Sequence, residues 1–333
     1  MALLRHPALA VRLRRWVTMP ALAPSEAVVL LEDVESRFGQ TRSLGGRQLV
    51  AWALFHRALR LGQMGRPDEA TASYEAVSRR FGDADEPSLR YWVAMAVMGR
   101  ATLLKELGHN EDALITFGHA AAAFEAAERG PVEPAVYSRV RELGAWAMWW
   151  QSSLLEEIGR REEALESALG LVRRFEDDGE HLVREKVASS LNQSASLLEN
   201  LGRIEEAVAA CEDVVRRFGA SSRVHLLEEV AYAVYGKAYL LGRLERHEQL
   251  VTYGEEVMRR FGAARHPELR ESVANVLLCQ GASLATLDRI PEALAVYEEI
   301  EQRFGRDANA DIHVCVAEAQ SRKHHLLGRE TAG

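Results

Sequence analysis

Hydrophobic residues recur along this chain with a long and nearly constant period. The most regular of them is a phenylalanine, which in five of seven cases lies between an arginine and a glycine. The seven phenylalanines are Phe38, Phe81, Phe124, Phe175, Phe218, Phe261 and Phe304. Successive members are 43 residues apart, except for one step of 51 between Phe124 and Phe175. Chance does not produce such spacing, which predicts a tandem array of one structural unit.

A second set of positions defines one helix of that unit. An alanine lies 30 residues before each phenylalanine from Phe81 onward, and a leucine follows each alanine after ten residues. The six alanines are Ala51, Ala94, Ala145, Ala188, Ala231 and Ala274, and Ala317 continues their spacing with Leu327 ten residues later. Apolar or small residues also occur three and seven positions after the alanine, and offsets of 0, 3, 7 and 10 lie on one face of an α-helix. We name this predicted helix "helix A".

A short turn and a second helix, helix B, complete the unit. The turn contains glycine in Leu107-Gly108-His109 and Leu201-Gly202-Arg203, and glycine can adopt the left-handed conformation that ends a helix. Helix B then begins with acidic residues such as Glu69 and ends in arginines, which matches the helix dipole. We therefore expect an all-α protein built as an α-solenoid.

The single long step locates an interruption in the array. The eight extra residues lie between Phe124 and Ala145, in a stretch with Gly130-Pro131 and Pro134. We expect an insertion and hinge over residues 125–140, which separates repeats in 25–124 from repeats in 141–310. Residues 311–333 are expected to form a C-terminal capping helix and tail. Residues 1–24 are interpreted as a degenerate N-terminal half-repeat.

The composition of the chain limits which partners it can bind and in which compartment it can be expected. The 333 residues carry a net charge of −8, so no broad basic field exists for nucleic acid. No uncharged apolar run reaches the about 18 residues that crossing a bilayer requires, so we expect no membrane partner. Three cysteines are too few for a disulfide framework and favour a cytoplasmic location. Four arginines and no acid in residues 1–24 leave a targeting peptide as the alternative to the half-repeat.

The repeat resembles the tetratricopeptide repeat (TPR) family, whose motif is W-x2-L-G-x2-Y followed by A-x3-F. Leu54 stands at the tryptophan of that motif, Ala58 at its glycine and Leu61 at its tyrosine, and Ala70 with Tyr74 forms the A-x3-aromatic pair. The resemblance covers nearly the whole chain and implies a right-handed superhelix of helix-turn-helix repeats. Two departures are the period, which is 43 instead of 34, and a polar residue six positions after the helix A alanine, where the family has leucine.

The resemblance further implies that helix A lines a concave groove that binds protein partners. The positions flanking its packing face, at offsets 1, 4 and 8 from the alanine, are rich in aromatic and amide side chains. The candidate partner-binding residues are Trp52, Phe55, Met95, Met98, Trp146, Trp149, Asn192, Tyr232, Tyr235, Tyr239 and Asn275. Exposed aromatics are typical of interface hot spots, and the two asparagines could bond a peptide backbone. The alternative is that the longer helices bury these aromatics between neighbouring A helices.

The charged residues of helix A indicate which kind of partner segment the groove would bind. No cluster of lysine and arginine is present to hold a carboxylate, whereas the inner frame contains Glu156, Glu157 and Glu199. We therefore expect a protein or peptide partner with an apolar or mildly basic segment, and we keep self-association open. Glu142, Glu185, Glu228 and Glu271 also recur in the frame and are interpreted as helix-face residues that pair with neighbouring arginines.

No motif in the chain indicates catalysis. Phosphate-binding glycine loops and the nucleophile elbow are absent, no histidines or cysteines have metal-ligand spacing, and the cysteines lie in helical core patterns. We therefore expect no enzyme activity, no cofactor and no metal. The favoured function is a protein-binding scaffold or adaptor. The alternative is a regulatory sensor that binds a small molecule or signalling peptide and changes its superhelix curvature.

Overall fold

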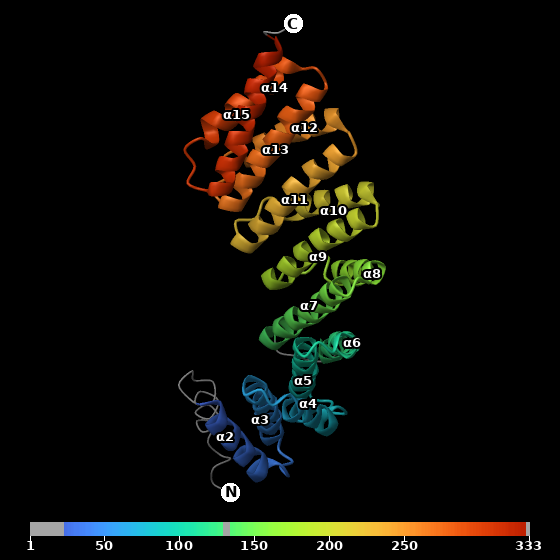
Figure 1. Ribbon diagram of the computed structural model, residues 1–333. Helices are drawn as coiled ribbons and strands as arrows, with labels where there is room; N and C mark the ends of the chain where they lie inside the picture. Colours follow the sequence, from blue (N-terminus) through green and yellow to red (C-terminus); the bar gives the residue numbers. More distant parts are fainter. Residues whose placement is uncertain (1–22, 129–133, 331–333) are drawn as a thin grey trace. The chain divides into compact units, whose positions relative to one another are not determined.

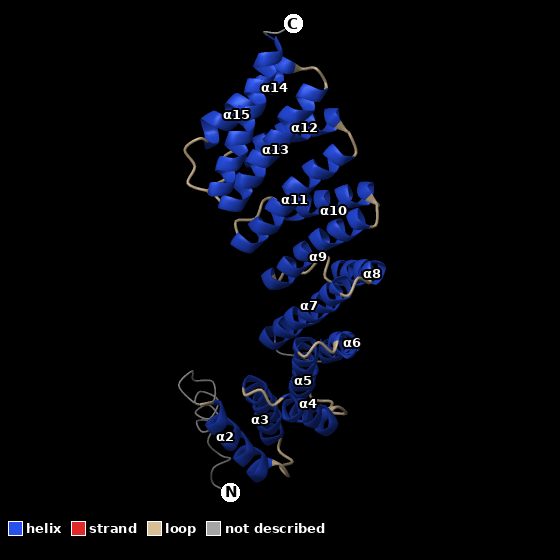
Figure 2. Cartoon of the chain, in the orientation of Figure 1, coloured by secondary structure: helices blue, strands red, loops and turns tan. Residues whose placement is uncertain are grey.

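The protein consists of α-helices joined by short loops. The computed structural model describes residues 23–128 and 134–330, and within them it contains 14 α-helices and no strand (Figures 1 and 2). The chain divides into two compact units, unit 1 at Met1–Arg160 and unit 2 at Arg161–Gly333. The all-α solenoid predicted from the repeat is confirmed.

Both units alternate helices B and A. In unit 1 the helices are α2 Pro24–Phe38, α3 Leu44–Gln63, α4 Pro67–Phe81, α5 Pro87–Glu106, α6 Asn110–Glu128 and α7 Pro134–Glu157. In unit 2 they are α8 Arg161–Arg174, α9 His181–Asn200, α10 Ile204–Phe218, α11 Val224–Arg243, α12 His247–Phe261, α13 Pro267–Thr286, α14 Ile290–Phe304 and α15 Ala310–Glu330. Odd-numbered helices from α3 onward correspond to helix A, and even-numbered helices correspond to helix B.

The periodic small residues explain why the two helices of each repeat stack closely. The helix A alanines Ala51, Ala94, Ala188 and Ala274 are fully buried, as are the helix B alanines Ala70, Ala113, Ala207 and Ala293. Small side chains at a helix crossing let the backbones approach, and the large apolar residues around them then interdigitate. The repeat period is therefore the period of the buried core.

The turns between helices A and B require a left-handed residue. The backbone has positive φ at Gly65 (69°), Gly108 (77°), Gly159 (82°) and Gly202 (75°). Glycine adopts this conformation without a Cβ clash, which is why it recurs there. The next two repeats place Glu245 (φ 54°) and Asp288 (φ 60°) at the same turn, so the fold keeps the conformation where the sequence lacks glycine.

The phenylalanine that ends helix B anchors the repeat. Phe218 is 3% exposed, and the guanidinium carbon of Arg184 lies 5.4 Å from the centroid of its ring. The following Gly219 has right-handed φ, so its role differs from that of the turn glycines. A Cβ at Gly219 would lie 2.4 Å from the carbonyl oxygen of Val215, so a larger residue there would require the backbone to shift.

The polar residue that replaces the family leucine joins an A helix to flanking B helices in two repeats of the array. Arg57 of α3 donates hydrogen bonds to Glu35 of α2 and to Ser73 of α4. In unit 2 the Lys237 ammonium lies 2.8 Å from the Glu212 carboxylate of α10. Because Lys237 also lies 4.2 Å from the centroid of the Tyr253 ring of α12, the residue at this position contacts both flanking B helices in these two repeats.

The insertion between Phe124 and Ala145 is partly described. Helix α7 has 24 residues, against 20 for α5 and α9, and its extra turn is at its N-terminal end. Helices α6 and α7 pack against each other on either side of the break. The boundary between the two compact units follows Arg160, and the expected hinge over residues 125–140 stays a prediction. The proposed hinge includes residues 129–133, which lie outside the described residues.

The two ends of the chain were predicted to form a half-repeat and a capping helix. Nearly all of the proposed N-terminal half-repeat lies outside the described residues, which begin at residue 23. Helix α15 covers the segment predicted as a capping helix, and its capping role stays a prediction. Among the helices that the structure describes, none combines the length and apolarity needed to cross a bilayer.

Candidate functional site

Three tyrosines form an exposed row on one helix of unit 2. Tyr232, Tyr235 and Tyr239 of α11 are 57%, 41% and 44% exposed. Their spacing of three and four residues places them on one face of the helix, and the ring centroids of Tyr235 and Tyr239 are 6.4 Å apart. Because α11 packs against both α9 and α13, the tyrosines lie on the middle helix of three. We name this exposed side of α9, α11 and α13 the A face.

The equivalent aromatics of α3 are buried. Trp52 and Phe55 are 4% and 6% exposed. Trp52 packs in a cluster that includes Leu31 of α2, and the Phe55 ring lies 5.8 Å from that of Tyr74 and 5.7 Å from that of Trp92. For these two residues the exposed-groove expectation is corrected to the packing alternative, because neighbouring helices cover the position.

The four candidates on α5 and α7 are intermediate in exposure. Met95 and Met98 pack at the edge of core clusters of unit 1. Trp146 and Trp149 are half-buried and contact each other edge to face, with ring centroids 5.8 Å apart. Each therefore combines packing with partial access to solvent, and a partner-binding role for them stays a prediction.

The two candidate asparagines are engaged with neighbouring helices. Asn192 is 5% exposed, and its amide donates to the backbone oxygen of Glu229 at 2.9 Å and to the Glu229 carboxylate at 2.7 Å. Asn275 is half-buried and accepts from the Cys315 thiol at 3.0 Å. Asn192 is therefore not on an open surface, and the expectation that it bonds a peptide backbone stays a prediction. Its Oδ1 atom is buried and has no hydrogen-bond partner within the described part of the chain.

Glu229 is a buried carboxyl beside the tyrosine row. Burial raises the pKa of Glu229 above the ordinary value of 4.5. Hydrogen bonds from Asn192 and Ser189 and the positive charge of Lys186 act in the opposite direction and lower this pKa. Burial also lowers the pKa of Lys186. This polar cluster joins α9 to α11 beneath the A face. The sequence analysis did not single out Glu229. The feature that could have identified it is that no other repeat has an acidic residue two positions before the helix A alanine.

The shifted pKa of Glu229 gives a pH-dependent prediction. Because its folded pKa is above its unfolded pKa, the folded state binds more protons than the unfolded state as pH rises past 4.5, and stability falls. Glu229→Gln removes this loss and keeps an acceptor for Asn192. We expect the variant to gain stability over the wild type from pH 4.5 upward, with the gain absent below that pH.

Urea titrations followed by circular dichroism at pH 4 to 8 measure the difference. Glu228→Gln is the matched control, since that carboxylate is more exposed and bonds His225 at 3.1 Å. The control should shift stability by about 0.5 kcal/mol or less at any pH. A gain for Glu229→Gln that is equal at pH 4 and pH 8 contradicts the argument.

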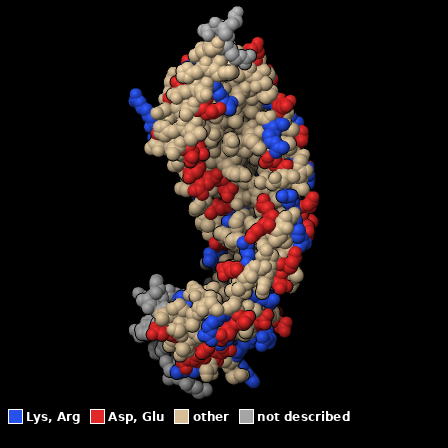
Figure 3. All heavy atoms as spheres, viewed as in Figure 1, with Lys and Arg blue, Asp and Glu red and all other residues tan. Residues whose placement is uncertain are grey.

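Acidic side chains gather where the A helices begin. Glu185 lies on α9, Glu228 and Glu229 on α11 and Glu271 on α13, each in the N-terminal half of its helix. Figure 3 shows acidic atoms concentrated at the edge of unit 2 from which α11 and α13 start. The sequence predicted arginine partners for the recurrent glutamates. Glu142 does pair with Arg139, but Glu228 contacts His225 and Glu271 accepts from Asn309. The edge is therefore net acidic.

A cavity opens at the other end of the tyrosine row. Its volume is 320 Å³, and it lies between α11 and α13 beside the start of α12. Tyr239 and Gly242 line it from α11, Leu250 from α12, and Cys279 and Ala282 from α13. Small residues at these positions of α13 leave room that a larger side chain would fill. The feature of the sequence that could have indicated this cavity is that small residues on α13 occur together with a tyrosine on α11.

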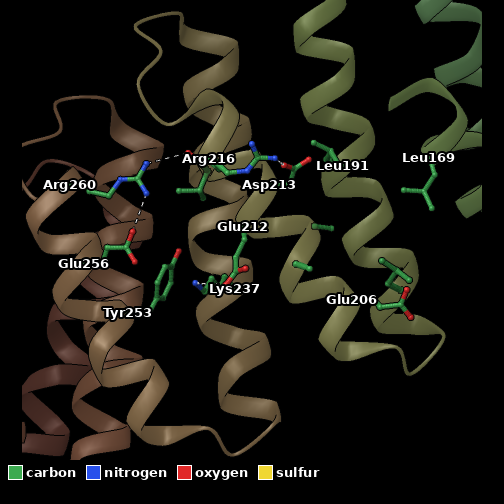
Figure 4. A pocket seen from close by; sticks show the side chains of 14 residues that line it. Leu169, Leu191, Glu206, Glu212, Asp213, Arg216, Lys237, Tyr253, Glu256 and Arg260 are labelled. Atoms are coloured by element: carbon green, nitrogen blue, oxygen red, sulfur yellow. Dashed lines mark hydrogen bonds and ion pairs between the residues drawn. The ribbon is translucent and has the colours of Figure 1, made fainter. Parts of the chain in front are cut away.

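A larger recess of 810 Å³ lies on the opposite side of α11, between α10 and α12 (Figure 4). Lys237 on its floor pairs with Glu212 and lies 4.2 Å from the centroid of the Tyr253 ring. Arg260 bonds the Glu256 carboxylate and the Val215 carbonyl. Because these charged groups already contact one another, the recess is less suited to a ligand than the A face.

Cys211 and Cys315 are buried, whereas Cys279 is partly exposed. Burial raises the pKa of Cys211 to about 12 and that of Cys315 to about 11, so both remain thiols at neutral pH. In the described part of the chain, no three histidine, cysteine, aspartate or glutamate side chains form a group able to hold a metal ion. The A face therefore offers aromatic and carboxylate contacts without an activated nucleophile.

Comparison with known proteins supports the repeat assignment. A tetratricopeptide repeat family model matches residues 188–218, which comprise most of α9 and all of α10. The crystal structure of the apo form of RapI is similar with a TM-score of 0.53 at 12% identity, covering 92% of this chain and 79% of that chain. The comparison with the TPR domain of P58(IPK) covers 99% of both chains at 14% identity and gives a TM-score of 0.30. This TM-score is too low to indicate a shared arrangement of the helices. No curated protein sequence matches the chain.

Proposed function

Because the chain is a tetratricopeptide-repeat protein, we propose that it is an interaction scaffold whose A face in unit 2 binds a segment of another protein. Repeats of this family generally act as protein-interaction scaffolds. The observation that carries the proposal is the exposed row of Tyr232, Tyr235 and Tyr239 on α11. Three exposed aromatic side chains on one helix face form an apolar patch, and such patches mark interaction sites. Aromatic side chains also contribute most of the binding energy at many interfaces.

The charges around the row support a partner segment that is apolar or mildly basic. The carboxylates at the start of α11 and α13 would attract a lysine or arginine and repel an acidic tail. The tyrosine rings supply apolar area with a polar tip, which suits a segment of mixed character. The sensor alternative depends on a hinge within residues 125–140, and no observation on the described residues favours it.

The experiment is affinity purification with the full chain from its native cells, comparing the wild type with Tyr235→Ala and with the variant in which all three tyrosines are alanine. Each tyrosine is expected to contribute about tenfold to affinity, so the triple variant should lose the specific partner. Tyr137→Ala on α7 is the matched control because that tyrosine is also exposed, at 39%, and lies outside the A face. Capture of the same partner by the triple variant contradicts the proposal, provided that circular dichroism shows unchanged helicity.

A further inference from the structure

Three different surfaces follow one another along α11. Carboxylates lie near its start, the tyrosine row occupies its middle, and the cavity beside Tyr239 and Gly242 lies at its end. All three are on the same side of the helix, since Tyr232, Tyr235, Tyr239 and Gly242 share a face. A ligand that lies along α11 would meet them in this order.

The acidic end is suited to a cationic side chain. Glu185, Glu228 and Glu271 come from three adjacent helices, with the buried Glu229 beside them, and the cations that interact with Glu185, Glu228 and Glu229 are Lys186 and His225. The neighbouring Arg184 and Arg270 lie over the rings of Phe218 and Phe304, and Arg270 pairs with Asp307. The carboxylates outnumber Lys186 and His225 even when His225 is protonated. A lysine or arginine of a ligand would therefore gain attraction there, and an aspartate or glutamate would be repelled.

The cavity end is suited to one apolar side chain. Its lining includes Ala238, Leu250, Cys279 and Ala282, with Ser283 and His247 bonded to each other at 3.2 Å near its edge. A cavity of about 150 Å³ can hold a benzene ring, so 320 Å³ accommodates a leucine or phenylalanine side chain with part of its backbone. Filling it would remove apolar surface from water at about 25 cal/mol per Å².

The distance between the two ends fixes a spacing. From Glu228 to Gly242 the helix advances by about 21 Å at 1.5 Å per residue. An extended peptide advances by about 3.3 Å per residue, so about six residues cover the same distance.

We propose, on the basis of the scaffold function above, that the A face of unit 2 binds an extended peptide lying along α11. The peptide carries a lysine or arginine at the acidic end and a leucine- or phenylalanine-sized side chain in the cavity, about six residues apart. The tyrosine rings contact the residues between these two anchors. Charge at one end and an apolar cavity at the other set the specificity, and the tyrosines contribute affinity that depends less on sequence.

The test selects ligands from a random library of 12-residue peptides displayed on phage, using the full chain as bait and the triple tyrosine-to-alanine variant for counter-selection. Peptides with a basic residue five to seven positions from an apolar residue are expected to be enriched. Labelled synthetic copies of the enriched peptides then give affinities by fluorescence anisotropy. Substituting either anchor of the peptide with serine should weaken binding about tenfold.

Two variants of the protein separate the anchors. Glu228→Gln with Glu271→Gln should abolish the preference for the basic residue and reduce the salt dependence of binding. Ala282→Leu fills the cavity and should abolish the preference for the apolar residue, with the basic preference kept. Glu205→Gln with Glu248→Gln, whose carboxylates pair with Arg246 and Arg289, is the control that should change neither.

The outcomes distinguish this inference from the function it rests on. Enriched peptides that depend on the tyrosines but show no fixed spacing, or that are acidic, overturn the two-anchor ligand and leave the scaffold function standing. Absence of any tyrosine-dependent peptide overturns the two-anchor ligand, and the scaffold function then depends on the affinity purification. Unchanged peptide preference in the Ala282→Leu variant, with normal helicity, overturns the assignment of the cavity.

Discussion

Replacing Phe218 with alanine is expected to lower the free energy of unfolding of unit 2 by about 3 to 5 kcal/mol. The ring is 3% exposed at the end of α10, so its loss leaves a cavity and removes the stacking of Arg184. Because each repeat is stabilised mainly by its neighbours, the loss should be concentrated in α9 to α12. Urea titration measures the total, and hydrogen exchange read by mass spectrometry locates it.

Phe38→Ala is the matched control for this prediction. Phe38 has the same position at the end of α2 but is only half-buried, because it belongs to the first repeat among the described residues. Its truncation should therefore cost clearly less, about 1 to 2 kcal/mol. Equal losses at Phe38 and Phe218 would show that burial within the array does not set the stability of the repeat.

The helical repeat could be predicted from the sequence because every unit must bury the same positions. Ala188, Leu198 and Phe218 are all buried, and their spacing alone placed helices A and B. The turn after helix A was predicted from glycine, and the structure shows the same left-handed residue at Glu245 and Asp288. Those two turns form because the flanking helices dictate the backbone, at a cost of about 1 kcal/mol that glycine avoids.

The candidate site was predictable only in part because exposure depends on neighbouring helices. Trp52 and Tyr232 have the same offset from the helix A alanine, yet they are 4% and 57% exposed. Trp52 faces Leu31 of α2, whereas Tyr232 lies on the open A face. Sequence periodicity gives the direction in which a side chain leaves its helix, but the length and tilt of adjacent helices decide what covers it.

The acidic edge illustrates a second limit of the sequence. Recurrence of Glu142, Glu185, Glu228 and Glu271 predicted pairing with arginines, and the structure supplies an arginine partner for Glu142. In unit 2 the nearby Arg184 and Arg270 instead lie over the rings of Phe218 and Phe304. Arg270 also pairs with the Asp307 carboxylate at 2.6 Å. These two arginines are therefore engaged with other groups, and the periodicity of the sequence does not show which group each arginine contacts.

The close contact between helices A and B makes a second large effect testable at a single position. Gly99 and Gly236 both lie five residues after the helix A alanine, on α5 and α11. A Cβ at Gly99 would lie 2.6 Å from the ring of Tyr74, which is 3% exposed and cannot move without displacing its neighbours. At Gly236 the nearest atom of another residue is the Cys211 sulfur at 3.4 Å, an ordinary contact.

Gly99→Ala is therefore expected to lower the free energy of unfolding by about 2 to 3 kcal/mol, because the cost of overpacking exceeds the gain in helix propensity. Gly236→Ala should instead raise it by about 0.5 to 1 kcal/mol, because alanine restricts the unfolded chain and favours the helix. Urea titrations of the two variants measure both signs. Stabilisation by Gly99→Ala would mean that Tyr74 can withdraw, and the approach of α4 to α5 would then be set by other residues. Opposite signs at one repeat position would show that each repeat adjusts its helix separation to the aromatic residue it carries.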